Sequence, residues 1–446
     1  MRRLFAARRF GVVLGLARMR ELLARLGTPQ QHLGTVIHVG GTNGKGSTVA
    51  MLAAIAGAAG VRTARYSSPH LSSLRERIVV ADEMISEADF VDHAERVAAA
   101  GGDEFTFFEQ ITAIALSYFA ASNVALTILE VGLGGRLDAT NVVDADVAVV
   151  TGVDMDHEAI LGTTPQQIAF EKAGIFKTGR GAVIGLSGLA AATPHLLAHA
   201  RAVGAGPVLL LNATDIAAVP HVALAGHHQR CNAAAALAAL DVLALQQPPL
   251  TIRFSASVRA AGLAHVRHPG RFERLTGTPT VILDGAHNPA GAAALARTLR
   301  DELGYQRQTT ALVLAVSADK PVAAMLAALA PHVGLIVATR YQQDRAMAAL
   351  DVATFGTEAA AAWATGVPPP LVVSAESLLP ALALAGAWPG VERIVVAGSL
   401  FLVGEARTAL CNAPCDPLVV TDPSATPPTA PVRSVGQITK PARITT

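Results

Sequence analysis

The chain has few cysteines and no long apolar run, and each shortage excludes a class of protein. Three cysteines, Cys231, Cys411 and Cys415, occur in 446 residues. At these spacings they form neither a disulfide framework nor a zinc site, which favours a reducing compartment. No uninterrupted apolar stretch approaches the roughly 20 residues that a membrane-spanning helix requires, so we expect no membrane span.

Charge is also scarce. Charged residues make up 15% of the chain, and the formal net charge at pH 7 is +1. This balance gives no electrostatic reason to expect a nucleic acid or an anionic membrane as partner. Residues 1–20 are basic and poor in acidic residues, as targeting peptides are. Arginines interrupt any apolar core there, and residues 15–26 have the pattern of an amphipathic helix. We therefore expect no cleaved signal and a cytoplasmic protein.

The hydrophobic content of 51% is typical of a globular protein, and 446 residues exceed what one hydrophobic core usually holds. Between residues 35 and 151 short apolar runs alternate with helical patterns. This alternation predicts a mostly parallel sheet with helices on both faces. The expected strands are residues 35–39, 62–66, 125–131 and 147–151, and the expected helices are residues 48–60, 86–100 and 107–121, followed by a later helix at 229–245.

The alternation restarts after residue 280. Strands are expected at 280–284, 311–316, 335–339 and 394–397, and helices at 289–303 and 322–329. The predicted fold is therefore α/β, with an N-terminal P-loop-type domain over residues 1–264 and a linker over 265–270. A smaller Rossmann-like α/β domain follows over 271–411. Residues 412–446 are rich in proline, threonine and serine, which predicts a disordered tail.

The most informative stretch is Gly-Gly-Thr-Asn-Gly-Lys-Gly-Ser-Thr at residues 40–48, between a predicted strand and a predicted helix. Backbone N–H groups and a helix N-terminus converge at such a turn and bind phosphate. Lys45 would reach the outer phosphate oxygens. The spacing differs from the standard P-loop, because only Thr42 and Asn43 separate Gly41 from Gly44. A simple glycine turn is the alternative, but the lysine and the flanking elements favour a nucleotide phosphate site.

Four further segments place polar residues at or near the ends of apolar strands. They contain Ser68, Glu130, the pair Asp156 and His157, and Lys172. Each has a structural alternative: a serine–proline turn around Ser68, an ion pair between Glu130 and Arg136, a helix N-cap at Asp156, and an ion pair between Lys172 and Glu171. A glutamate within an apolar strand is costly to bury unless it is paired or binds a cation. Together the segments favour a site for Mg²⁺, which prefers oxygen ligands and bridges phosphates.

With these residues in place, the chain resembles the folylpolyglutamate synthase/dihydrofolate synthase family of the Mur ligase superfamily. The resemblance runs from about residue 15 to 407, and its motifs occur in the family's order. It rests on Gly-Thr-Asn-Gly-Lys-Gly-Ser at 41–47, Ser-Ser-Pro-His-Leu at 67–71, Glu-Val-Gly-Leu-Gly-Gly-Arg-Leu-Asp-Ala-Thr-Asn at 130–141, Asp-His at 156–157, Glu-Lys-Ala-Gly-Ile at 171–175, Gly-His-His-Gln at 226–229 with Asn232, Pro-Gly-Arg at 269–271, Asp-Gly-Ala-His-Asn-Pro at 284–289 and Gly-Ser-Leu-Phe at 398–401.

The resemblance implies roles for individual residues. The nucleotide would be bound by Thr42, Asn43, Gly44, Lys45, Gly46, Ser47, Asn232, Arg271 and Asp284. Ser68, Glu130 and His157 would bind Mg²⁺, and Lys172 would be carbamylated, which converts its cation into an anion. Lys45, Lys172 and His157 would be the catalytic residues, and Thr106, Phe108, His287 and Ser399 would contact the substrates. The implied cofactors are ATP and two Mg²⁺ ions, with K⁺ as a further candidate.

The implied reaction is ATP-dependent formation of an amide between L-glutamate and dihydropteroate or a folate, through an acyl phosphate, in a monomeric enzyme. One alternative is a cell-wall Mur-type ligase, although no separate UDP-binding domain precedes residue 35. Another is a non-catalytic nucleotide-binding relative, which the joint presence of Lys45, Glu130, His157 and Lys172 disfavours.

Overall fold

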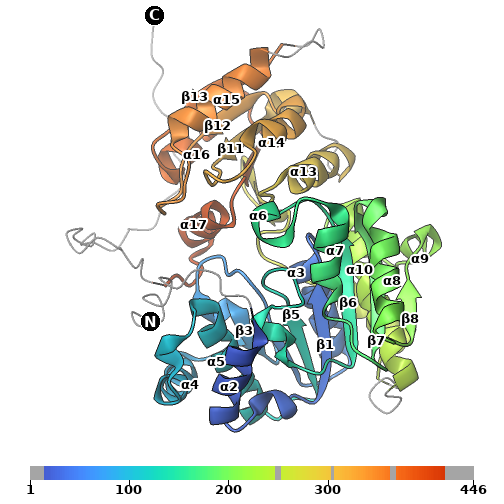
Figure 1. The fold of residues 1–446 in the computed structure, drawn as a ribbon. Helices are drawn as coiled ribbons and strands as arrows, with labels where there is room; N and C mark the ends of the chain where they lie inside the picture. The colour runs from blue at the N-terminus through green and yellow to red at the C-terminus, as the bar shows by residue number, and fades with distance from the viewer. Residues whose placement is uncertain (1–14, 247–252, 303–305, 362–367, 417–446) are drawn as a thin grey trace, which may run out of the picture.

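The computed structural model describes residues 15–246, 253–302, 306–361 and 368–416, which form two lobes, each built around its own sheet (Figure 1). The N-terminal lobe contains an eight-stranded sheet in the order β4-β3-β2-β5-β1-β6-β7-β8. In this spatial order, the neighbouring strands β2-β5-β1-β6-β7-β8 all pair in parallel. Strands β3 and β4 continue the sheet beyond β2 as an antiparallel edge. The strands are β1 (Thr35–Gly40), β2 (Thr63–Tyr66), β3 (Ile78–Val80), β4 (Glu83–Met84), β5 (Leu126–Glu130), β6 (Val147–Val153), β7 (Gly181–Gly188) and β8 (Val208–Leu210).

Helices cover both faces of this sheet, because its central strands β1, β5 and β6 are buried along their whole length. On one face α3, α10 and α12 share a core with the inward side chains of β1 and β5, and the other face packs against α5 and α7. The helices of this lobe are α2 (Leu16–Arg25), α3 (Lys45–Ala58), α4 (Glu87–Ala99), α5 (Phe107–Ala121), α6 (Glu158–Leu161), α7 (Pro165–Ala173), α8 (Thr193–Ala202), α9 (Ala213–Ala217), α10 (His227–Gln246) and α12 (Ala256–His265).

The C-terminal lobe contains a six-stranded sheet in the order β13-β12-β11-β14-β10-β9, parallel except for the edge strand β9. Helices α13 and α14 pack on one face, and α16 and α17 pack on the other. The elements are β9 (Glu273–Leu275), β10 (Thr280–Leu283), α13 (Pro289–Glu302), β11 (Thr310–Leu314), α14 (Val322–Leu329), β12 (Leu335–Ala338), α15 (Ala349–Ala361), β13 (Leu371–Ser374), α16 (Leu378–Ala387), β14 (Arg393–Ala397) and α17 (Leu400–Cys411).

The expected α/β architecture, with a large N-terminal sheet and a smaller C-terminal one, is confirmed. The helix expected at 48–60 begins earlier, at Lys45, so the lysine belongs to its first turn. Strands β7 and β8 and helix α8 were not predicted, and β8 and α8 lie in the alanine-rich residues 186–225, whose pattern is hard to interpret. No helix in the described ranges is long and apolar enough to cross a bilayer.

The lobes touch on the side where α17 meets the loop after β2 (Figure 1). The Ser72 hydroxyl donates to the carbonyl of Gly404 at 3.0 Å. Asp416, in the segment expected to be disordered, accepts hydrogen bonds from the Ser73 hydroxyl and the Leu74 N–H. The described part of the predicted tail, residues 412–416, thus contacts the N-terminal lobe through Asp416, and residues 417–446, the rest of that prediction, lie outside the described ranges.

Candidate active site in the cleft between the lobes

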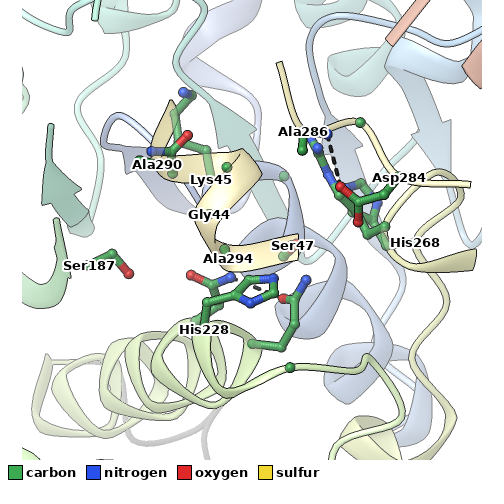
Figure 2. A pocket seen from close by; sticks show the side chains of 18 of the residues that line it. Gly44, Lys45, Ser47, Ser187, His228, His268, Asp284, Ala286, Ala290 and Ala294 are labelled. Carbon is green, nitrogen blue, oxygen red and sulfur yellow. Dashed lines mark hydrogen bonds between the residues drawn. The ribbon is translucent and has the colours of Figure 1, made fainter. Parts of the chain in front are cut away.

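A cleft of about 1930 Å³ opens between the two sheets, and residues from both lobes line it. Figure 2 shows Gly44, Lys45 and Ser47 of the phosphate loop around the same cleft as Ala290 and Ala294 of α13. The linker between α12 and β9 contributes His268 and Arg271 to the lining. Most of the residues predicted to form the site, although far apart in sequence, meet in this cleft.

The phosphate loop connects β1 to α3, and its glycines are required by space and backbone conformation. Gly44 has φ +88°, and a Cβ there would lie 2.1 Å from the side-chain oxygen of Asn232. Gly41 has φ +137°, and a Cβ there would lie 2.0 Å from the Thr151 hydroxyl. The loop therefore curls tightly, and the N-terminus of α3 faces the cleft, as phosphate binding requires.

Two loop residues predicted to bind nucleotide use their side chains to fasten the loop to the end of β6. The Thr42 hydroxyl accepts from the Asp154 N–H at 2.9 Å, and Asn43 Nδ2 donates to Asp154 Oδ2 at 3.1 Å. This leaves their backbone, rather than their side chains, to face a phosphate. Asp154 directly follows the buried strand β6, at the start of the polar segment that ends at His157, and the sequence assigned it no role of its own.

Lys45 lies along its own loop. Its Nζ donates to the carbonyls of Gly41 and Thr42, both at 3.0 Å. Burial lowers the pKa of Lys45, and the nearby carboxylates of Glu130 and Asp156 oppose that shift. Because the partners are backbone carbonyls of the loop, a phosphate would compete for the ammonium at the same place.

Glu130 ends β5 with its side chain in the cleft. Its Oε2 accepts from the Ser68 N–H at 3.1 Å, which brings two predicted metal ligands together. The alternative pairing with Arg136 is excluded, because Arg136 instead pairs with Glu171 at 2.7 Å. Burial raises the pKa of Glu130, and Lys45 opposes the shift. A buried carboxylate held mainly by one N–H group has oxygen lone pairs free for a hard cation.

His157 also lines the cleft, but its side chain is 49% exposed. Burial lowers its pKa against the effect of Asp156, which favours the neutral imidazole that binds metals. Within the described ranges, no three His, Cys, Asp or Glu side chains form a cation site by themselves. A divalent ion held by Ser68, Glu130 and His157 would therefore need further oxygens, such as those of phosphates.

Lys172 is the most unusual charged residue here. It is 3% exposed on α7, and burial, then the charge of Lys45, lowers its pKa to about 7. Its Nζ makes no hydrogen bond to the described part of the chain, and Glu171, the alternative partner, is occupied by Arg136. A buried amine that is easily neutral can react with CO₂.

The opposite wall of the cleft comes from the C-terminal lobe. Asp284 follows β10 and accepts from the N–H group of Phe272 at 2.9 Å. It also accepts from the Ala286 N–H at 2.9 Å (Figure 2). Burial raises the pKa of Asp284, and Arg271 opposes it. His287 Nδ1 bonds the Gly285 carbonyl at 2.7 Å, so its other nitrogen remains available, and burial lowers its pKa to about 4.

Two other predicted residues line the cleft, Ser399 from the C-terminal lobe and Asn232 from the N-terminal lobe. Ser399 caps α17 by accepting from the Phe401 N–H at 3.2 Å, and it lines the cleft. Asn232 on α10 donates to Gln229 at 3.0 Å, while its buried Oδ1 has no hydrogen-bond partner within the described ranges. An unpaired buried oxygen beside the phosphate loop fits a ligand N–H or hydroxyl.

Two predicted substrate residues lie elsewhere. Thr106 caps α5 in a capping box with Glu109, and the Thr106 hydroxyl donates to Glu109 Oε2 at 2.9 Å. Phe108 packs behind the cleft-lining Gly132 and has its ring centroid 6.2 Å from that of Tyr66. Neither lines the cleft, so their contact with a substrate stays a prediction.

Sequence reading also missed residues that bind Asp156. Asp156 is not the N-cap of α6, because His157 occupies that position. Its carboxylate is instead bound by Lys320 Nζ at 3.1 Å and Asn288 Nδ2 at 3.2 Å from the other lobe. The available signal was positional: Asn288 and Lys320 follow β10 and β11, at the strand ends where ligands bind.

We expect Gly44→Ala to destabilise the protein by about 1–3 kcal/mol, because the new Cβ would be strained and would overlap Asn232. Nucleotide affinity should fall as the loop shifts. Gly57→Ala, in open space on the same helix, should stabilise by about 0.5–1 kcal/mol. Denaturant unfolding and calorimetric titration with ATP measure both effects, and equal stability of the two variants would contradict the assigned loop strain.

Two family models match the chain. Residues 39–186 match the Mur ligase middle domain, and residues 272–409 match the C-terminal domain of dihydrofolate synthetase. The Mycobacterium tuberculosis dihydrofolate synthase/folylpolyglutamate synthase is 34% identical over 90% of this chain and 90% of its own. A Halobacterium salinarum protein, a probable bifunctional folylpolyglutamate synthase/dihydropteroate synthase, is 36% identical over 90% of this chain. The chain spans 50% of that longer relative.

Solved structures of similarly named proteins resemble this chain over most of its length. Escherichia coli FolC in complex with DHPP and ADP has a TM-score of 0.78 and 31% identity, over 90% of this chain and 94% of its own. A bifunctional folylpolyglutamate synthase/dihydrofolate synthase with Mn, AMPPNP and L-glutamate bound has a TM-score of 0.75 and 31% identity, over 90% of this chain and 95% of its own.

Proposed function

The chain belongs to the dihydrofolate synthase/folylpolyglutamate synthase family, and we propose that it is an ATP-dependent ligase that joins L-glutamate to dihydropteroate or a reduced folate. One observation carries the proposal. The phosphate loop, the pair Ser68 and Glu130, and the buried Lys172 face Asp284 and His287 across one cleft. Among the similar solved structures, one has DHPP and ADP bound, and another has Mn, AMPPNP and L-glutamate bound.

A carboxylate is a poor acyl donor to an amine, because oxide or hydroxide would have to leave. The reaction therefore begins by activating the carboxylate. Transfer of the ATP γ-phosphoryl group to the acceptor carboxylate gives an acyl phosphate and ADP. The glutamate amine then attacks the carbonyl carbon, the carbon–oxygen bond to phosphate breaks, and the nitrogen loses a proton. The protein contributes mainly positioning and charge neutralisation.

The residues divide this work between the lobes. The loop N–H groups and Lys45 would hold the β- and γ-phosphates, with Ser47 in the first turn of α3. Arg271, Asn232 and Asp284 would bind the nucleotide across the cleft, and His287 and Ser399 would lie near the incoming glutamate. Bound Mg²⁺ would neutralise phosphate charge, and Ser68, Glu130 and His157 are the residues that would hold it. A second Mg²⁺ and K⁺ remain further proposals.

The domain boundaries also remain proposals. We infer an N-terminal catalytic domain to residue 264 and a linker at 265–270, where α12 ends and the chain crosses to β9. This division is supported by the cleft, which is lined both by the proposed ATP-binding residues of the N-terminal lobe and by the proposed glutamate-binding residues of the C-terminal lobe. Ligation needs the ATP and the glutamate to be held next to each other.

Phosphate release tests the function. The native chain should release phosphate only when ATP, Mg²⁺, L-glutamate and either dihydropteroate or a reduced folate are present together. Use of a UDP-linked acceptor with another amino acid would favour a cell-wall Mur-type ligase. Nucleotide binding without phosphate release under any combination would make the chain a non-catalytic relative.

We expect Glu130→Gln to raise the Mg²⁺ concentration for half-maximal activity by about tenfold or more, because a neutral amide is a poorer ligand for a hard cation. Asp241→Asn, which removes an exposed carboxylate paired with Arg259, should leave that concentration unchanged. Titration of activity with Mg²⁺ measures both variants. Unchanged metal dependence in Glu130→Gln would assign the glutamate to structure alone.

A further inference from the structure

Asp156, beside the phosphate loop of the N-terminal lobe, is bound by two side chains of the C-terminal lobe. It follows β6, whereas Lys320 follows β11 and Asn288 precedes α13 in the other sheet. Lys320 Nζ lies 3.1 Å from Asp156 Oδ1, and Asn288 Nδ2 donates to Asp156 Oδ2 at 3.2 Å. Each oxygen of one carboxylate thus has its own partner from the opposite lobe.

Asn288 extends the contact to the phosphate loop. Its Nδ2 also donates to Asn43 Oδ1 at 3.2 Å, while its Oδ1 accepts from the Gly291 N–H at 2.8 Å in its own lobe. The amide is therefore oriented by the first turn of α13 and directs its donors to the N-terminal lobe. Asn43 in turn is fastened to Asp154, so the contact reaches the loop that would hold the phosphates.

The surroundings make these contacts stronger than an ordinary surface pair. The side chains of Asp156 and Lys320 are 13% and 11% exposed, and Asn288 is buried. Removal of one partner would therefore leave a poorly solvated charge in this contact.

We propose that Asp156, Lys320 and Asn288 form an inter-lobe latch that keeps the cleft closed over the acyl phosphate until the glutamate amine attacks. The proposal rests on the proposed ligase function. These are positioning residues, and their effect is exclusion of water. If the latch is released, a water oxygen attacks the carbonyl carbon, the carbon–oxygen bond to phosphate breaks, and the products are the original carboxylic acid and phosphate.

Loss of the latch should leave the lobes folded and joined. The Ser72–Gly404 and Asp416–Ser73 hydrogen bonds connect them through α17 and the segment after it. The latch is therefore a contact separate from these two, and its removal should loosen the closed cleft without separating the lobes. The number of phosphates released per amide formed measures how well the cleft stays closed. In a tightly closed ligase this ratio is one.

The experiment compares Lys320→Met with a matched control. Asp319→Asn removes the neighbouring ion pair between Asp319 and Arg345, which also spans 3.1 Å but is more than half exposed and lies within one lobe. Phosphate and amide are measured in the same reactions at saturating ATP, Mg²⁺, acceptor and glutamate. We expect a ratio of about one for the native chain and Asp319→Asn, and a ratio raised at least about threefold in Lys320→Met, because breaking a partly buried pair weakens closure.

A double-mutant cycle with Asp156→Asn separates the latch from effects on the adjacent His157. Because both single changes break the same ion pair, Lys320→Met should add little in the Asp156→Asn background. Additive effects, a ratio of one in Lys320→Met, or an equal rise in Asp319→Asn would each overturn the latch. Loss of both products together in Lys320→Met would make Lys320 a catalytic residue and would also overturn it. Absence of acceptor-dependent phosphate release by the native chain would instead refute the ligase function.

Discussion

Lys172→Ala loses most of the ligase activity, and Lys172→Arg loses as much, if the amine works as a carbamate. An ammonium next to Mg²⁺ ions is repelled, whereas a carbamate is attracted, so the sign of the charge decides the outcome. Arginine keeps the positive charge and cannot be carbamylated. Since removal of a charged group that organises a metal cluster costs a large part of catalysis, we expect a loss of about 100-fold or more.

The carbamate itself can be followed. Burial lowers the pKa of Lys172 to about 7, so the neutral amine that reacts with CO₂ predominates above that pH and becomes scarce below it. Removing CO₂ from the buffer should therefore reduce activity, more severely at pH 6 than at pH 8, and bicarbonate should restore it. Short carboxylic acids should partly rescue Lys172→Ala by supplying an anion. Lys177→Arg, at an amine that donates to Asn141, should retain activity. An active Lys172→Arg together with an unmodified amine in the active native chain would disprove the carbamate.

Lys45→Ala should abolish turnover and leave the fold intact. In the structure the ammonium contacts only backbone carbonyls of its own loop among the described residues, so its removal breaks no side-chain pair. Its positive charge is needed when charge develops on the transferred phosphoryl group, and loss of such a group typically lowers kcat by about 100- to 1000-fold. Steady-state kinetics gives kcat, and thermal unfolding checks that the fold is retained.

Two comparisons make the Lys45 result specific. Lys45→Arg keeps the charge but not the compact ammonium, so it should recover only part of kcat. Calorimetric titration with ATP should show a smaller loss in binding than in kcat, because the loop N–H groups remain. A near-normal kcat in Lys45→Ala would remove the lysine from the proposed phosphate site.

The sequence by itself determined the architecture where periodicity was strong. Central strands β1, β5 and β6 are buried along their length and mostly apolar, and α5 and α14 occupy the predicted residues, since burial on both faces or on one stripe leaves a clear pattern. It also placed polar residues at strand ends, and in a parallel sheet those ends meet at one edge. Ser68 and Glu130 reached the same cleft for that reason, whereas Lys172, also expected near a strand end, reaches it from helix α7.

Only the tertiary structure decided which charges are paired. Glu130 and Lys172 each had a plausible partner nearby in sequence, but packing of the 132–136 turn on α7 joins Arg136 to Glu171 and leaves the other two groups in the cleft. The partners of Asp156, Lys320 and Asn288, are even more distant in sequence, because they belong to the other lobe. Local patterns record burial and turns, whereas a contact between lobes depends on how two cores pack. For that reason the motifs could be read from the sequence, and the latch could not.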